Sequence, residues 1–181
     1  MRLPEILRKR LLLAAFRTIE ARKPDVTIGP PDDVYLERWF VIPRNRVFNI
    51  YLHRFRRSDD DRALHDHPWW NLSLVLHSGY VEERPVHRDA PSGRRHATYR
   101  RQGSLLLRRP RQAHRLALLA GEPRPITLFL TGPRQREWGF WCPQGWRHWK
   151  KFTAAGPTHE GQLIGLGCGE DPEETARRIA P

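Results

Sequence analysis

HDHPWWNLSLVLHSGY, residues 65–80, carries the pattern that decides the fold and the candidate site. Two histidines, His65 and His67, stand one residue apart, and the segment after them alternates leucines with other side chains up to Gly79. Such alternation predicts a β-strand, in which residues i and i+2 point the same way about 6.6 Å apart. The two imidazoles can therefore coordinate the same metal ion.

The alternation also separates two faces of this segment. Trp69 and Asn71 lie in line with His67 on one face, whereas the opposite face carries only leucines. Side chains on successive strand residues point to opposite sides of a sheet. We therefore expect the polar face to line an interior space and the leucines to pack against a second layer. Trp69 and Asn71 become candidate pocket residues.

Further short strands are predicted on both sides of this segment. They lie at residues 35–42, 47–55, 97–101, 104–108, 115–119 and 126–131. Strands at a spacing of about 8–12 residues, separated by turns with glycine and proline, are typical of antiparallel sandwiches and barrels. Helices are predicted at residues 3–22, where apolar residues recur at intervals of three and four, and at residues 171–180.

These residues resemble the motifs of the cupin superfamily of small β-barrels. The first cupin motif has a His-x-His pair and a closing glycine, which His65, His67 and Gly79 match. The second motif has a glycine, a proline and a histidine, and it is matched in order by Gly103, Pro110 and His114. The resemblance covers about residues 45–131. It implies an all-β fold, a cupin-like double-stranded β-helix barrel, or jelly roll.

The chain departs from the cupin motif at its glutamate, a position that Asn71 occupies. An asparagine carbonyl is a weak and neutral ligand. The resemblance therefore implies a three-histidine set of His65, His67 and His114, similar to that of cupin thiol dioxygenases, where three imidazoles hold ferrous iron. Imidazole also suits zinc, nickel and copper, so the expected cofactor is one divalent transition metal, with iron(II) preferred and zinc or nickel as alternatives.

Other residues are candidates for contact with a substrate. Tyr51 and His53 share a face of the strand predicted at 47–55, and the resemblance implies that a tyrosine or arginine binds a substrate carboxylate. Tyr51, His53 and Tyr99 are candidate catalytic residues, and Arg54 is a candidate pocket residue beside Trp69 and Asn71. Arg46 is a further candidate. An ordinary role remains open for each, as a solvated arginine or a packed strand residue.

A second aromatic region, REWGFWCPQGWRHW, spans residues 136–149. Four tryptophans and a phenylalanine are unfavourable to expose, so this region must pack on the barrel or on a partner. We expect a helix at 1–24, a barrel at 33–135 and a packed extension at 136–181. Nearby cysteines and histidines fit no zinc pattern; they are Cys142, His148, His159 and Cys168.

Composition limits the class of protein and its location. Two cysteines cannot make a disulfide scaffold, and a cytoplasmic location is expected. No run reaches the roughly 20 apolar residues of a membrane span, and the run Leu11–Phe16 is short for a secretory signal. The net charge of +12 admits an anionic ligand or nucleic acid, but arginines dominate it and are spread over the chain. A homodimer is also expected, as is common among cupins.

The favoured function is a mononuclear metal-binding cupin. Within that class we favour a non-haem iron oxygenase that acts on a small substrate, which can be an anion. Two alternatives stay open. One is a non-catalytic cupin module that binds a small molecule or nucleic acid. The other is a metal-free isomerase or epimerase with a histidine inside the barrel as general base.

Overall fold

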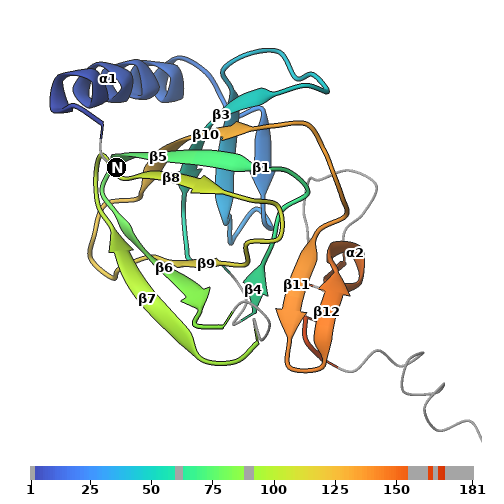
Figure 1. The fold of residues 1–181 in the computed structure, drawn as a ribbon. Helices are drawn as coiled ribbons and strands as arrows, with labels where there is room; N and C mark the ends of the chain where they lie inside the picture. Colours follow the sequence, from blue (N-terminus) through green and yellow to red (C-terminus); the bar gives the residue numbers. More distant parts are fainter. Residues whose placement is uncertain (1–2, 60–62, 88–91, 155–162, 165–166, 170–181) are drawn as a thin grey trace, which may run out of the picture.

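The computed structural model describes residues 3–59, 63–87, 92–154, 163–164 and 167–169. Its first element is helix α1 (Glu5–Ala21), which lies across one face of the β-structure (Figure 1). Pro4 immediately precedes the helix, where a missing N–H is tolerated. The inner side of α1 packs Ala15 into a core cluster with Trp39, Leu52, Leu74, Leu76 and Ile126. The predicted N-terminal helix is confirmed.

The remaining described elements are almost all short strands. They are β1 (Val26–Ile28), β2 (Leu36–Phe40), β3 (Asn49–Phe55), β4 (Leu64–His65), β5 (Asn71–His77), β6 (Tyr80–Pro85), β7 (Arg95–Arg100), β8 (Leu105–Arg108), β9 (Arg115–Ala117), β10 (Ile126–Thr131), β11 (Gly139–Cys142), β12 (Gly145–His148), the short helix α2 (Trp149–Phe152), β13 (Thr153–Ala154) and β14 (Leu163–Ile164). All the strand pairs described are antiparallel.

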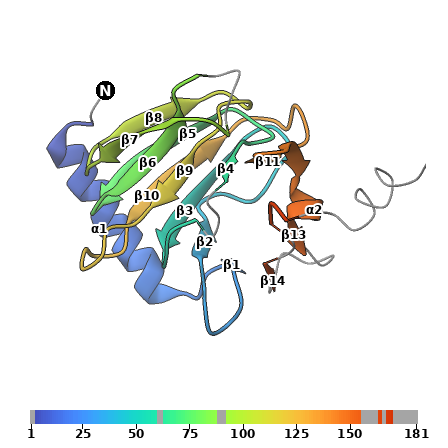
Figure 2. The same cartoon turned by 90° about the horizontal axis from the view of Figure 1, so that it is seen from below.

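Eight strands form two layers that face each other (Figure 2). One layer has the order β3-β10-β5-β8 and is extended at β3 by β2 and β1. The other has the order β7-β6-β9, and β4 joins it beside β9 through a bridge between His65 and His114. Apart from the β6–β7 hairpin, the chain changes layer at each successive strand from β3 to β10, which is the connectivity of a jelly roll. The predicted all-β, cupin-like double-stranded β-helix is confirmed.

Strand β5 separates the two sides of its layer as its alternation predicts. Leu74 and Leu76 point outward into the cluster under α1, while Val75 points inward and packs with Tyr80 and Leu116. Ser73 also faces inward and lines the interior pocket. The leucine face is therefore covered by a helix, and the opposite face is left for the interior of the barrel.

The tryptophan-rich region forms the β11–β12 hairpin and α2, which lie beside β4 (Figure 1). Phe140 pairs with His65 across β11 and β4, and its ring stacks on Phe152 at 3.6 Å between centroids. A disulfide joins Cys142 to Cys168. This hairpin therefore brings aromatic side chains to the histidine pair. His159 and the helix predicted at 171–180 lie outside the described residues.

None of the described helices has the length and hydrophobicity that a bilayer crossing requires.

Candidate metal centre and pocket

Three imidazoles from two separate segments come together between the layers. The backbones of His65 and His114 exchange two N–H···O hydrogen bonds of 2.9 Å, which fixes the loop before β9 against β4. The amide of His67 donates to the carbonyl of Pro110 at 3.0 Å, so the third ring is held over the same loop. Ring centroids lie 4.7 Å apart for His65 and His114, and 5.1 Å apart for the other two pairs.

The donor atoms of this cluster fit a single metal ion. One ligand nitrogen from each ring lies within 4.8 Å of the others, and the Nε2 atoms of His67 and His114 are 2.9 Å apart. Two nitrogens bound to one ion at about 2.0–2.1 Å are separated by roughly 3 Å in the usual coordination geometries. Among the described residues, this is the one group of three or more metal-ligating side chains.

Carboxylates lie behind two of the three rings. Glu82 on β6 is 1 % exposed, and its Oε1 lies 3.2 Å from Nδ1 of His114. Asp59 places Oδ2 3.5 Å from Nδ1 of His65 and is itself held by the amide of Leu116 at 2.7 Å. Outer partners of this kind set the tautomer and orientation of metal-ligating histidines. The arrangement leaves Nε2 of His65 and His114 for an ion.

Burial keeps the imidazoles of His67 and His114 neutral. Burial, reinforced by the charge of Arg108, lowers the pKa of His114 to about 3. Burial and the neighbouring His114 hold the pKa of His67 well below its usual range. Burial alone would raise the pKa of Glu82, but its hydrogen bond with His114 and the charge of Arg108 outweigh burial and lower that pKa. Neutral imidazoles backed by an ionised carboxylate are the forms that a divalent metal requires.

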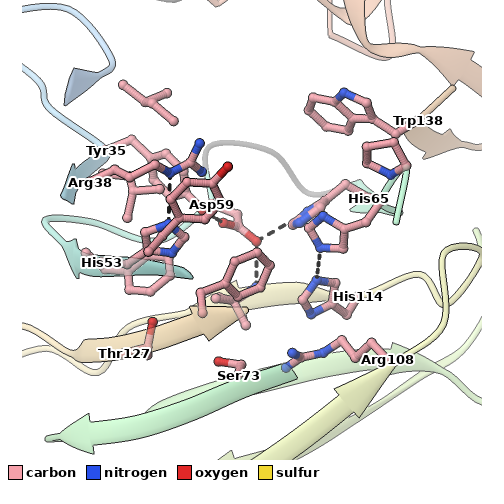
Figure 3. A pocket seen from close by; sticks show the side chains of 18 of the residues that line it. Tyr35, Arg38, His53, Asp59, His65, Ser73, Arg108, His114, Thr127 and Trp138 are labelled. Carbon is pink, nitrogen blue, oxygen red and sulfur yellow. Dashed lines mark hydrogen bonds and ion pairs between the residues drawn. The ribbon is translucent and has the colours of Figure 1, made fainter. Parts of the chain in front are cut away.

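A pocket of about 310 Å³ adjoins the three histidines. Its walls come from the inner faces of both layers and from the β11–β12 region, with Trp138 on the same side of the pocket as His65 (Figure 3). Most of the lining is aromatic or aliphatic, including Phe129, Phe140 and Leu116. The volume is in the lower range of small-molecule sites.

The structure brings some of the candidate residues to this pocket. Tyr51, His53 and Trp69 line it, and the rings of Tyr51 and His53 stack at 5.9 Å between centroids. Nε2 of His53 accepts a hydrogen bond of 2.9 Å from Nε of Arg38. Burial, with the charge of Arg38, holds the pKa of His53 well below its usual range, so this ring is neutral.

Other candidates lie elsewhere. Asn71 is fully buried, and its side-chain oxygen accepts from Nη1 of Arg108 at 3.3 Å. Arg54 points to the opposite face of β3 from its neighbour His53 and pairs with Glu37. Tyr99 is 49 % exposed on β7, and Arg46 is exposed on a loop. These four residues are therefore not among those that line the pocket.

Several residues of the site are missing from the sequence-based prediction. Glu82 belongs to β6, whose sequence YVEERP lacks a clear apolar alternation and therefore does not predict a strand. Arg38 belongs to a predicted strand and shares its face with Leu36 and Phe40, all three of which line the pocket. The opposite face of this strand carries the buried Trp39, so the sequence pattern alone does not show which of the two faces turns toward the pocket. Tyr35 and Asp59 also line the pocket, and the hydroxyl of Tyr35 donates to Asp59.

Comparisons with known proteins place the chain near double-stranded β-helix structures. No family model and no curated protein matches it. A putative mannose-6-phosphate isomerase from Ralstonia eutropha JMP134 shares 18 % identity over 60 % of this chain and 92 % of that chain, with a TM-score of 0.45. A cupin-like protein from Thermotoga maritima shares 12 % over 61 % of this chain and 78 % of that chain, at 0.43.

A further similar structure is hydroxypropylphosphonic acid epoxidase from S. wedmorenis, with 11 % identity and a TM-score of 0.43. The match covers 61 % of this chain and 57 % of the epoxidase. At such identities and TM-scores these likenesses carry no argument about activity. The fold assignment rests on the strand order, and the site must be judged by its own geometry.

Proposed function

We propose that this chain is a mononuclear metal-binding cupin in which His65, His67 and His114 hold one divalent transition metal. Within that class we propose a non-haem iron oxygenase that acts on a small anionic substrate. The observation that carries the proposal is the convergence of three imidazoles, two of them backed by carboxylates, on the wall of a mostly apolar pocket.

One set of residues around the site would bind and orient the ion, and another set would bind the substrate. A bound ferrous ion would supply the redox chemistry and the activation of dioxygen that side chains cannot supply. Glu82 and Asp59 hold the rings of His114 and His65 in place, which fixes the positions of the ligand nitrogens. The aromatic walls, including Trp138 and Phe129, would exclude water and fix the substrate beside the histidines.

Tyr35 and Asp59 could also hold a proton close to the site. Burial and the nearby Asp59 carboxylate raise the pKa of Tyr35 well above its usual range, so its hydroxyl stays protonated. That hydroxyl donates to one oxygen of Asp59, while the other oxygen faces His65. The chain Tyr35–Asp59–His65 therefore places a carboxylate beside the cluster and a phenolic proton at the pocket wall.

Metal analysis of the protein tests the metal assignment. The protein is purified without a polyhistidine tag from iron-supplemented cells, and the metal content is measured by mass spectrometry. We expect about one equivalent of metal, loss of that metal in His114→Ala, and full retention in His96→Ala, a substitution of an exposed histidine on β7. A metal content that is equal in the two variants would contradict the assignment.

A second measurement tests the oxygenase assignment. Dioxygen needs an open coordination position, and nitric oxide is its spectroscopic substitute. We expect the ferrous protein, treated anaerobically with nitric oxide, to give the electron paramagnetic resonance signal of a high-spin iron–nitrosyl centre. Metal without this signal would favour a non-catalytic binding module. Absence of metal under all loading conditions would favour a metal-free isomerase or epimerase.

We also propose that residues 1–24, 33–135 and 136–181 form the helix, barrel and packed extension. The pairing of β11 with β4 supports that division. The proposed partner is a small molecule; binding of nucleic acid to the basic surface and formation of a homodimer stay predictions. The cytoplasmic location also stays a prediction, and the Cys142–Cys168 disulfide weighs against it, since such bonds are rare in reducing compartments.

A further inference from the structure

The charged groups of the pocket are not balanced. Arg108 is neutralised by Glu82, to which its Nε donates at 2.8 Å. Asp59 faces His65 and accepts hydrogen bonds from Tyr35 and a backbone amide. Arg38 also lines the pocket, yet within the part of the chain that the structure describes it has no carboxylate partner.

Arg38 is held in place by contacts that leave most of its hydrogen-bonding capacity unused. Its Nε donates to Nε2 of the neutral His53 at 2.9 Å, and its guanidinium carbon lies 4.8 Å from the centre of the Tyr51 ring. His53 is in turn stacked between Tyr51 and Phe129, with ring centroids at 5.9 and 5.1 Å. The two terminal amino groups have no partner among the described residues, so an oriented fork of donors faces the pocket.

A second positive charge reinforces this end of the pocket. Arg44, an exposed residue that also lines the pocket, stacks its guanidinium over Phe40 at 5.7 Å. Two like charges near each other, with one of them largely buried, are unfavourable unless an anion lies close to them. Burial lowers the pKa of Arg38, as expected for a guanidinium without a countercharge.

We infer that Arg38 binds the anionic group of the substrate, and that His53 and Tyr51 position Arg38 for this task. Figure 3 shows Arg38 and His53 on the opposite side of the pocket from His65 and His114. A substrate anchored at Arg38 would therefore extend its body across the apolar walls toward the histidines. This inference rests on the proposed function for the reaction, and it assigns the substrate to small organic acids with an apolar or aromatic body.

The guanidinium fork matches a carboxylate and a phosphonate equally well in principle. Isothermal titration calorimetry with one probe of each kind compares the two anions. The metal-free protein is used, because a bound metal could itself bind the oxyanion. The probes are phenylacetate, phenylphosphonate and phenylacetamide, the last being a neutral analogue of the first. We expect either anion to bind about tenfold to hundredfold more tightly than the amide, the range of one charged hydrogen-bonding partner.

Substitutions assign that preference to Arg38. Arg38→Gln should abolish the preference for the anion and leave binding of phenylacetamide unchanged. Arg38→Lys keeps the charge and should retain part of the preference. That result would show that the effect of Arg38→Gln comes from the lost charge and not from misfolding. Arg54→Gln is the matched control, because Arg54 lies on the neighbouring strand but on the outer face, paired with Glu37. It should behave as the wild type.

Equal affinity for phenylacetate and phenylacetamide in the wild type would overturn the inference, as would a preference that survives Arg38→Gln. The metal assignment is tested separately by the metal content of the same preparations. Anion preference without metal binding would refute the proposed function and leave Arg38 as an anion-binding residue. Metal binding without anion preference would refute only the role of Arg38.

Discussion

Glu82 connects the core of the protein to the candidate metal centre. Its two oxygens accept hydrogen bonds of 2.8 Å from Nε of Arg100 and of Arg108, and Oε1 also faces His114. A carboxylate with 1 % exposure persists as an ion only because these partners replace its hydration. One residue therefore stabilises two guanidinium groups and orients a proposed ligand.

Glu82→Gln should therefore weaken both metal binding and the fold. Loss of a carboxylate behind a ligating histidine typically lowers metal affinity 10–100-fold, and breaking a buried ion pair costs about 3–5 kcal/mol of unfolding free energy. Competition with a chelator and urea denaturation measure the two effects. Glu83→Gln, on the same strand but 26 % exposed toward Arg95 and Arg115, should change each only slightly. Equal effects of the two substitutions would contradict this account of Glu82.

Buried neutral histidines make the metal-free protein sensitive to acid. His53 and His114 are each 3 % exposed, and both have a pKa below the ordinary value of 6.5. As the pH falls below about 6.5, these histidines become protonated in the unfolded chain but stay unprotonated in the folded chain. The free energy of unfolding therefore decreases. Each ring contributes at most about 1.4 kcal/mol per pH unit, and for His114 the decrease continues until the pH approaches its folded pKa of about 3.

Urea denaturation of the metal-free protein between pH 7.5 and pH 5 tests this expectation. Stability should be highest above pH 6.5 and should fall as the solution becomes more acidic. His53→Gln, which removes one of the buried rings, should show a shallower decrease below pH 6.5. A wild-type stability that stays constant down to pH 5 would show that these rings are not held neutral by burial.

At the scale of elements, the β11–β12 hairpin depends on Asp66, the residue between His65 and His67. Asp66 is fully buried and accepts from the amide of Gly139 at 3.0 Å and from Nε1 of Trp146 at 3.1 Å. It also forms an ion pair with Arg136 at 2.9 Å. The segment that carries His65 and His67 thereby holds the β11–β12 hairpin, and Trp138, which lines the pocket, immediately precedes that hairpin.

Asp66→Ala should loosen that hairpin, because it leaves three buried or partly buried donors without their acceptor. We expect a loss of about 3–5 kcal/mol in unfolding free energy and a red shift of tryptophan emission. Urea denaturation followed by fluorescence measures both. Asp32→Ala, at an exposed loop position, is the control and should leave them unchanged. An Asp66 variant as stable as this control would show that the hairpin is held by its aromatic packing alone.

The elements that could be predicted are those whose periodicity is local. The alternation of β5 identifies its covered and interior faces, and the spacing of apolar residues identifies α1. Strands β6 and β11 could not be predicted, because β6 pairs with β9 and β11 pairs with β4, and both partners lie far along the chain. The contact between Glu82 and His114 spans 32 residues and exists only after the two layers close.

The candidate site shows the same division between local patterns, which can be predicted, and long-range contacts, which cannot. The His-x-His spacing places His65 and His67 together, and His114 follows from the family resemblance. Residue parity places Tyr51 and His53 on the pocket side, and the same parity excludes Arg54. Choosing Arg38 instead requires knowledge of which face of β2 turns inward, and that depends on its pairing with β3.

At the scale of the whole molecule, the protein has a barrel, a helix on one face and an extension beside β4 (Figures 1 and 2). The extension is attached to the barrel by the pairing of β11 with β4 and by the contact of the Phe140 ring with His65. Within the extension, Phe140 stacks on Phe152 and a disulfide joins Cys142 to Cys168. The net charge of +12 is not gathered in one segment of the sequence, and some arginines form ion pairs inside or beside the barrel. The excess positive charge is therefore not by itself a nucleic-acid site.

The disulfide should contribute measurably to global stability. It closes a separation of 26 residues, for which loop-closure entropy predicts about 3.5 kcal/mol at 25 °C. Cys142→Ser with Cys168→Ser should lower the urea midpoint, and a phosphine reductant should lower the wild-type midpoint to the same value. The reductant should leave the double variant unchanged. A wild-type midpoint that does not respond to complete reduction would contradict this contribution.

The central claim is that three imidazoles inside the barrel bind one metal ion. Anomalous diffraction at the iron absorption edge, from crystals grown anaerobically with ferrous iron, tests it most directly. The account predicts one strong peak at about 2.0–2.2 Å from a nitrogen of His65, His67 and His114. Iron bound elsewhere, or rings of the three histidines that do not meet at a common point, would contradict it.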